Sequence, residues 1–263
     1  MTDFPPSATD KHPPKRRIRQ SFERAAATYD SAADVQRRIC CRLVAGLPAG
    51  LAPSRLLDAG CGTGYARSLL ETRFPAADYI GLDLSPGMLS RIDADKLRIA
   101  GDLEHLPLTD ACVDLYWSSL AVQWCELSKA LSEARRVLRP GGRIALASLG
   151  PKTFHELRQA FAGVDEYRHT LAFHTAEEIE KLAQASGLVA VDVQNSTEIA
   201  HYPDFRSLLK AVKAIGANQL GDGRRTSLMS RSSFNRAEAA FEASRTPAGL
   251  PLTYDVLTLS AQT

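Results

Sequence analysis

The stretch LLDAGCGTGY, residues 56–65, decides the fold predicted for this chain of 263 residues. A short apolar run ends at Asp58, three glycines alternate with other residues, and a helical pattern follows from about Tyr65 to Arg73. Glycine adopts positive φ angles without strain and lets a ligand come close to the backbone. The stretch therefore predicts a buried strand, a ligand-binding turn and a helix, the beginning of an α/β sheet.

The same alternation of short apolar runs and helical patterns continues towards the C-terminus. Strands that alternate with helices are typical of βαβ units, in which a parallel sheet carries helices on both faces. The predicted strands cover residues 78–83, 97–100, 113–117 and 143–149, and a helix over residues 127–138 stops at Pro140-Gly141-Gly142.

The last hundred residues extend this pattern and then interrupt it. Two helices are predicted after Gly150, the second beginning with Thr175 and Glu178 in capping-box spacing. A strand over residues 188–194 and a final strand over residues 252–259 enclose a helical insert, residues 203–250. The insert breaks the strand–helix alternation and is a candidate for contacts with a substrate.

Before the glycine stretch, the chain has no strand pattern. Residues 1–14 are rich in Pro, Ser and Thr and predict a disordered tail. Two amphipathic helices are predicted within residues 15–50, with a cap between them at Asp30 or Ser31 and an end at Pro48 and Gly50. Their apolar positions are Ile18, Phe22, Ala25 and Tyr29 in the first, and Val35, Ile39, Leu43 and Leu47 in the second.

Composition excludes several classes of protein. The chain carries 32 basic and 30 acidic residues, a net charge of +2, which does not suggest a nucleic-acid binder. No apolar run approaches the roughly 18 residues of a membrane-spanning helix, and the N-terminus lacks the pattern of a secretory signal. Five cysteines without a CxxC pair, and six histidines without metal-ligand spacing, predict neither disulfides nor a metal site. The expected location is the reducing cytoplasm.

The acids around the glycine stretch indicate what the turn binds. A nicotinamide dinucleotide favours G-x-G-x-x-G, whereas this chain has G-x-G-x-G directly after Asp58. A carboxylate at that point repels a pyrophosphate and suits a cation. Asp83, at the end of the next predicted strand, is placed to hold ribose hydroxyls. A nucleoside that carries a positive charge and no phosphate fits best, which favours S-adenosylmethionine (SAM) over a nicotinamide cofactor.

Four motifs in the same order and spacing resemble the class I SAM-dependent methyltransferases. They are DAGCGTG (residues 58–64), IGLDLS (80–85) with Met88, GDL (101–103) and LRPGGR (138–143). The resemblance implies a Rossmann-like fold with a mostly parallel seven-stranded sheet, an antiparallel last strand and helices on both faces. It divides residues 15–263, a single domain, into an N-terminal helical cap (15–50), a SAM-binding core (51–150) and the helical insert.

The resemblance also assigns roles to individual residues. Gly60, Cys61 and Gly62 are expected to line the methionine end of SAM, with Cys61 contributing its backbone and not acting as a nucleophile. Asp83 is expected to bind the ribose, Leu84 and Met88 to pack on adenine, and Asp102, with Leu103 beside it, to accept from the adenine amino group. The expected cofactor site is completed by Tyr29, Asp58 and Ser118.

Outside the cofactor motifs, the chain resembles the malonyl-acyl carrier protein O-methyltransferases of biotin synthesis. The similar segments are SFERAAATYD (21–30), SSLAVQW (118–124), LGPKTFHEL (149–157), residues 202–217 and TPAGLPLTYD (246–255); LAV at 120–122 departs from the expected LAL. The resemblance implies methylation of the free carboxylate of a malonyl thioester on carrier protein or on CoA. Another small-molecule SAM-dependent methyltransferase, or an inactive SAM-binding module, remains an alternative.

A malonyl carboxylate is ionised at neutral pH, so no catalytic residue is assigned: positioning and a dry pocket are expected to suffice. Trp124 is expected to meet the substrate, and an arginine or lysine of the insert to hold its carboxylate. The candidates are Arg206, Lys210, Lys213, Arg224 and Arg225. Because basic residues outnumber acidic ones in the insert, its surface is also expected to dock an acidic acyl carrier protein, with Arg231 and Arg236 taking part.

Overall fold

A single seven-stranded sheet organises the computed structural model, which describes residues 13–93, 97–215 and 229–263. The strand order is β3-β2-β1-β4-β5-β7-β6. The first five strands are parallel, while β7 is antiparallel to both β5 and β6. The predicted fold is thus confirmed. The strands are β1 (Arg55–Ala59), β2 (Asp78–Asp83), β3 (Leu97–Ala100), β4 (Val113–Ser119), β5 (Leu138–Leu149), β6 (Val189–Tyr202) and β7 (Leu250–Gln262).

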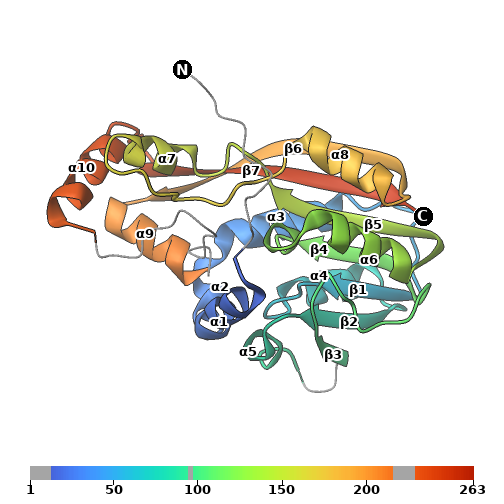
Figure 1. Cartoon of the computed structure of the whole chain (residues 1–263). Coiled ribbons are helices and arrows are strands. Elements are labelled where there is room, and N and C mark those ends of the chain that lie inside the picture. Colours follow the sequence, from blue (N-terminus) through green and yellow to red (C-terminus); the bar gives the residue numbers. More distant parts are fainter. Residues whose placement is uncertain (1–12, 94–96, 216–228) are drawn as a thin grey trace.

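Helices cover both faces of the sheet because successive strand residues point to opposite sides. Leu56 joins one apolar cluster, with residues of α3 (Asp34–Ala45), α4 (Tyr65–Arg73) and α7 (His155–Ala162). Leu57 joins a second cluster, with residues of α6 (Leu127–Val137) and α8 (Ala176–Ala185). The sheet is therefore the middle layer of the protein (Figure 1).

The N-terminal helices differ from the prediction. The segment forms α1 (Lys15–Ala25), the short helix α2 (Tyr29–Ala32) and α3, so there are three helices where two were expected. The predicted cap at Asp30 or Ser31 is wrong, because α3 begins after Ala33 without a side-chain cap. The Asp30 carboxylate instead accepts a hydrogen bond from Thr63 Oγ1 at 2.7 Å. This contact ties α2 to the glycine turn.

Most other predicted boundaries agree with the structure, including the capping box of Thr175 and Glu178. Two are wrong: β6 continues to Tyr202 where the predicted strand ended at residue 194, and α6 ends at Val137, with Pro140-Gly141-Gly142 inside β5. The backbone is already extended at Leu138, where β5 pairs with Val113 of β4. Pairing with the neighbouring strand therefore ended this helix before the glycines did.

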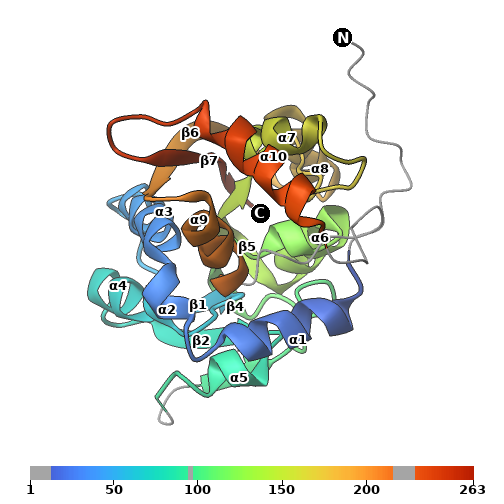
Figure 2. The same cartoon turned by 90° about the vertical axis from the view of Figure 1, so that its left-hand side faces the viewer.

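The described part of the insert before β7 contains two helices, of which the second packs against α7. They are α9 (Phe205–Ala214) and α10 (Arg231–Glu242), and Figure 2 shows α10 beside α7. Phe205 is fully buried, with its ring 5.2 Å from that of Phe241 and 6.2 Å from that of Phe161. No helix in the described ranges is both long and apolar enough to cross a membrane.

Candidate functional site

The glycine turn presents bare backbone to open space at the ends of β1 and β2. Gly60 and Gly62 have φ angles of 79° and 56°. A Cβ on Gly60 would lie 2.2 Å from Ala121 Cβ, so this glycine is required by packing. A Cβ on Gly62 would meet no protein atom within 4 Å, so this glycine leaves room for something outside the turn. Two pockets border the turn, and we name them the β2 pocket and the loop pocket; a third, the apolar pocket, shares lining residues with both.

The β2 pocket, of about 610 Å³, lies between the ends of the strands and α1. Leu84, Met88 and Leu103 supply apolar wall, and Ile18 and Phe22 of α1 cover it. Met88 is buried against Ala25 and Ala26, also of the N-terminal segment. Figures 1 and 2 show α1 lying beside α5 (Pro86–Leu89), which carries Met88. The pocket thus has an apolar wall and is covered on one side by a helix.

Asp83 contributes a carboxylate to the β2 pocket at the end of β2. Its Oδ2 accepts from the Gly62 amide at 2.9 Å, and its Oδ1 accepts from the Ser85 amide at 2.8 Å. Burial raises the pKa of Asp83 to about 6, although these amides oppose the change. The Leu84 amide also opposes the rise, and the fixed carboxylate keeps acceptor capacity for a further donor such as a hydroxyl.

Asp102 lines the same pocket but has a cation beside it that the sequence did not reveal. Lys15 Nζ lies 2.9 Å from Asp102 Oδ1, 2.6 Å from Glu104 Oε1 and 3.4 Å from Cys125 Sγ. These three side chains are grouped closely enough to hold a metal ion, but the Lys15 ammonium already lies among them. Lys15 thereby fastens the beginning of α1 to the far wall of the β2 pocket.

The loop pocket, of about 470 Å³, contains a buried carboxylate with one free oxygen. Asp58 is fully buried; its Oδ2 accepts from the Tyr79 hydroxyl at 2.7 Å, whereas Oδ1 has no partner. Burial raises the pKa of Asp58 from its ordinary 3.8 to about 7, with Asp83 adding to the effect and Tyr79 opposing it. Arg37 of α3 lines the same pocket. A buried acid and an arginine there match a ligand with both an ammonium and a carboxylate group.

Cys61 lines the loop pocket beside these charges but is not an activated thiol. Burial raises the pKa of Cys61 well above its ordinary value, and Asp58 and Asp83 raise it further. A nucleophilic cysteine needs the opposite shift. The backbone amides of Gly60 and Cys61 both donate to the Leu82 carbonyl, at 2.7 and 2.9 Å, and this fixes the turn against β2.

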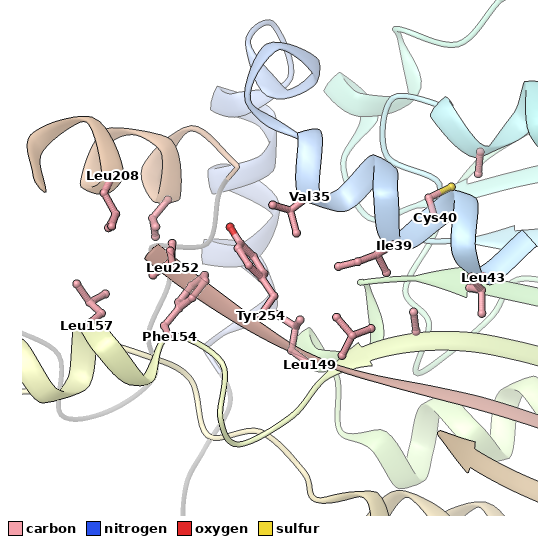
Figure 3. Packing of buried hydrophobic residues seen from close by; sticks show 14 of the residues in the cluster. Val35, Ile39, Cys40, Leu43, Leu149, Phe154, Leu157, Leu208, Leu252 and Tyr254 are labelled. Atoms are coloured by element: carbon pink, nitrogen blue, oxygen red, sulfur yellow. The ribbon is translucent and has the colours of Figure 1, made fainter. Parts of the chain in front are cut away.

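The apolar pocket, of about 550 Å³, is formed by parts of the chain that are far apart in the sequence. Leu149 comes from the end of β5, Phe154 from the loop after it, and Tyr254 from β7, with the two rings 4.9 Å apart edge to face. Figure 3 shows these three side chains on the side of the sheet that faces α3. Ile215, at the end of α9, also lines this pocket, so the insert reaches it.

Tyr29 of α2 lines all three pockets. Trp124 and Phe22 line both the β2 pocket and the apolar pocket, and their rings meet edge to face at 5.7 Å. Burial, followed by the neighbouring Asp83 and Asp30, raises the pKa of Tyr29, so its phenol stays protonated at neutral pH. The three pockets therefore meet at Tyr29, whose phenol is neutral.

Two groups of expected residues are not found among the linings of these three pockets. The Ser118 hydroxyl donates to the Ala59 carbonyl at 2.7 Å, and its neighbour Ser119 lines the pockets instead. The exposed Arg206, Lys210 and Lys213 do not line the apolar pocket. Arg224 and Arg225 lie outside the described residues. Of the expected cofactor residues, the β2 and loop pockets bring together Tyr29, Asp58, Gly60, Cys61, Gly62, Asp83, Leu84, Met88, Asp102 and Leu103.

Sequence reasoning missed Lys15, Gln36, Arg37 and Ser119 as lining residues. Gln36 and Arg37 fall on the polar side of a predicted amphipathic helix, which carries no signal of its own. Ser119 differs from Ser118 only by the alternation of side chains along β4.

Comparison with known proteins first defines the class. The family model described as "Methyltransferase domain" matches residues 57–146. A SAM-dependent methyltransferase of Thermotoga maritima, described as a possible histamine N-methyltransferase, has a similar structure, with a TM-score of 0.56 and 18% identity. That similarity covers 93% of this chain and 99% of the other. The protein therefore has the fold of SAM-dependent methyltransferases.

Two curated relatives identify the family within that class. A malonyl-[acyl-carrier protein] O-methyltransferase of Dechloromonas aromatica is 71% identical over 250 residues, 95% of each chain. One of Herminiimonas arsenicoxydans is 38% identical over 250 residues, 94% of this chain and 96% of its own. The chain belongs to the malonyl-[acyl-carrier protein] O-methyltransferase family.

Proposed function

We propose that this protein transfers a methyl group from SAM to the free carboxylate of a malonyl thioester on an acyl carrier protein. The malonyl methyl ester that results starts pimeloyl synthesis for biotin. The observation that supports this most directly is the meeting of three pockets at Tyr29. The β2 and loop pockets suit the adenosine and methionine ends of SAM. The apolar pocket begins where these two meet and has mostly apolar walls, as suits an acyl chain.

The described residues fit SAM at each of its polar groups. Asp58 Oδ1, buried without a partner, suits the ammonium of the methionine end, and Arg37 suits its carboxylate. Asp83 suits the ribose hydroxyls, and Leu84 and Met88 the adenine ring. When bound, SAM supplies an electrophilic methyl group on a sulfonium. The assignment includes no metal ion.

Asp102 also suits adenine, but only one of its two carboxylate oxygens is available to accept from the amino group. Its Oδ1 already accepts from Lys15 and from the Glu104 amide. We therefore assign Oδ2 to the adenine amino group. Lys15 then holds the carboxylate in place and contributes to the cofactor site indirectly.

The chain does not need to provide a general base, because a carboxylate with an ordinary pKa near 4 is ionised at neutral pH. What it must provide is a dry, well-oriented site. Leu149, Phe154 and Trp124 keep water out of the junction. Without water, the separated carboxylate and sulfonium lose solvation, so the transition state, in which their charges neutralise each other, is favoured. If an arginine or lysine held the substrate carboxylate about 5 Å from the sulfonium, the two positive charges would repel each other by about 3 kcal/mol at an effective dielectric constant near 20.

The carrier protein is proposed to dock on the insert. Within the described part of the chain, Lys210, Lys213 and Arg231 are exposed, whereas Arg245 is paired with Glu242. Ile215, which follows α9, lines the apolar pocket, so a carrier bound at α9 would lie near its entrance. An acidic carrier would be attracted over roughly 10 Å at 0.1 M salt. The exposed stretch around Arg16 and Arg19 of α1 is the second candidate surface.

The remaining assignments concern the chain as a whole. We propose that residues 15–263 act as one methyltransferase domain in the cytoplasm, with neither nucleic acid nor membrane as partner. The cap (15–50) closes the cofactor site, the core (51–150) binds SAM, and the insert (203–250) meets the carrier. All five cysteines are free thiols, as suits a reducing compartment.

The test is methyl transfer from tritiated SAM to a panel of carriers bearing malonyl, succinyl, glutaryl and acetyl groups, with malonyl-CoA as a further substrate. Labelled malonyl carrier, with a mass increase of one methyl group that mild alkali removes as an ester, supports the proposal. Transfer to none of these substrates by a protein that binds SAM would contradict it. Transfer to other small molecules only would identify a different methyltransferase.

A further inference from the structure

The apolar pocket contains polar side chains, but none of its described lining residues is charged. A terminal carboxylate brought to the junction at Tyr29 would therefore meet neutral groups first. This differs from the expectation that a cation of the insert holds it, because Arg206 lies over the Phe234 ring at 4.8 Å and does not line this pocket. The polar lining residues are Tyr29, Gln36, Gln123, Thr170 and Tyr254.

Gln36 stands out among these residues because of its position and its partner. It lines both the apolar pocket and the loop pocket, so it lies where a substrate would meet the methionine end of the cofactor. Burial raises the pKa of Tyr254 well above its ordinary value, Tyr202 beside it adds to the shift, and a hydrogen bond with the Gln36 side chain opposes it. The Tyr254 ring is buried beside Phe154, on the face of the sheet below α3 (Figure 3). Since the hydrogen bond with Gln36 lowers the pKa of Tyr254, Gln36 donates in it, and one hydrogen of its NH₂ group remains for a substrate.

The other candidates are less suited to an anion. Gln123 uses Nε2 to donate to the Leu120 carbonyl at 2.7 Å, and its Oε1 is buried without a partner. That oxygen can only accept, so it would repel a carboxylate. Thr170 Oγ1 lies 3.4 Å from Arg158 Nη1, a cation that does not itself line the pocket. Gln36 and Tyr29 remain as the donors closest to the junction of the pockets.

We propose that Gln36 and Tyr29 hold the substrate carboxylate through neutral hydrogen bonds, with Tyr254 as the residue that positions Gln36. This inference rests on the proposed function and names the groups that select a terminal carboxylate. A neutral amide and phenol orient one carboxylate oxygen and leave the other free to react, whereas a bidentate arginine would occupy both. They also add no positive charge beside the sulfonium.

The test compares binding of two carriers to the enzyme saturated with S-adenosylhomocysteine. One carries malonyl, and the other carries butyryl, which has similar length and no carboxylate. In the wild type we expect malonyl to bind about 10- to 100-fold more tightly, the size of one or two hydrogen bonds to a charged group. In Gln36→Leu this preference should fall at least tenfold, with butyryl binding unchanged. Calorimetry measures both affinities, and the ratio cancels any effect on the cofactor.

Further variants separate positioning from contact. Tyr254→Phe should weaken malonyl binding by a smaller factor and lower kcat more than it raises KM, because Gln36 is present but less well fixed. Gln184→Leu, on the exposed face of α8, is the matched control and should leave every value at the wild-type level. Gln36→Met serves as a second variant of similar length if Gln36→Leu unfolds at a lower temperature.

Specific outcomes would overturn the inference while the proposed function stands. The inference is overturned if the wild type methylates malonyl carrier while Gln36→Leu and Gln36→Met keep the full preference for binding malonyl over butyryl carrier. Loss of that preference in Arg158→Gln, or in the double variant Arg224→Gln/Arg225→Gln, would then assign the carboxylate to a cation. If the wild type itself transfers no methyl group to malonyl carrier, the proposed function fails first.

Discussion

Replacing Asp58 by asparagine should make the protein more stable and, at the same time, a poorer binder of SAM. Asp58 is fully buried, Tyr79 satisfies only its Oδ2, and Oδ1 has no partner. Because burial raises the pKa of Asp58 from 3.8 to about 7, ionising it costs free energy in the ligand-free protein. The asparagine side chain would keep the size of Asp58 and its contact with Tyr79 without that charge.

The size of the stability effect follows from the pKa change. The folded protein binds this proton more tightly than the unfolded chain, so the contribution of Asp58 to stability is present below pH 3.8 and is lost as pH rises to about 7. A difference of about 3 pH units corresponds to about 4 kcal/mol at most. At pH 8, without ligand, Asp58→Asn should therefore unfold at a higher temperature than the wild type; at pH 4 the two should be nearly equal.

The effect on binding has the opposite sign. An ammonium close to Asp58 gains a net interaction of about 2 kcal/mol once desolvation is included, so Asp58→Asn should bind SAM about 30-fold more weakly. In the wild type, a proton and the ammonium compete for the carboxylate, so affinity should fall as pH drops below about 7. The variant should lose most of this dependence above pH 6, below which Asp83, with its pKa near 6, still titrates.

The assays are thermal unfolding without ligand and calorimetry with SAM between pH 5.5 and 8. Asp192→Asn, on the exposed part of β6, is the control and should change neither quantity. Tyr79→Phe removes a hydrogen bond that lowers the pKa of Asp58, so the fall in affinity should begin at a higher pH. Equal SAM affinity and equal pH dependence in the wild type and Asp58→Asn would refute the role of Asp58.

Three other positions test the cofactor site, its lid and the docking surface. Gly62→Val should fold but show no SAM binding by calorimetry, because its side chain would enter the proposed ligand space at a φ of 56°. Gly50→Val is the control, and an unchanged SAM affinity of Gly62→Val would refute the assignment. Lys15→Met removes the ion pairs that fasten α1, so S-adenosylhomocysteine should dissociate roughly fivefold faster in stopped-flow fluorescence. An unchanged dissociation rate would show that these ion pairs do not hold α1 over the pocket. Arg231→Glu/Arg236→Glu should flatten the decrease of kcat/KM for malonyl carrier with salt, and a wild-type salt response would place docking elsewhere.

Local patterns were sufficient for the sheet and for the cofactor turn. Alternating apolar runs predicted the strands, since each strand packs against helices on both faces, and three closely spaced glycines identified the turn. The same local reasoning failed where a distant partner intervened. Asp30 does not cap a helix because Thr63 takes its carboxylate, and α6 ends early because Leu138 pairs with Val113.

By itself, the sequence determined the α/β fold and the family, and it predicted the two acids that are proposed to face the cofactor, Asp58 and Asp83. These depend on residues close in the chain, whose spacing fixes their backbone conformation. Only the tertiary structure decided which side chains share a pocket with them. Gln36 and Tyr254 are more than two hundred residues apart, and they meet because β7 returns between β5 and β6 and places Tyr254 on the face of the sheet that α3 covers. Such contacts come from the packing of the whole chain, and no local pattern encodes them.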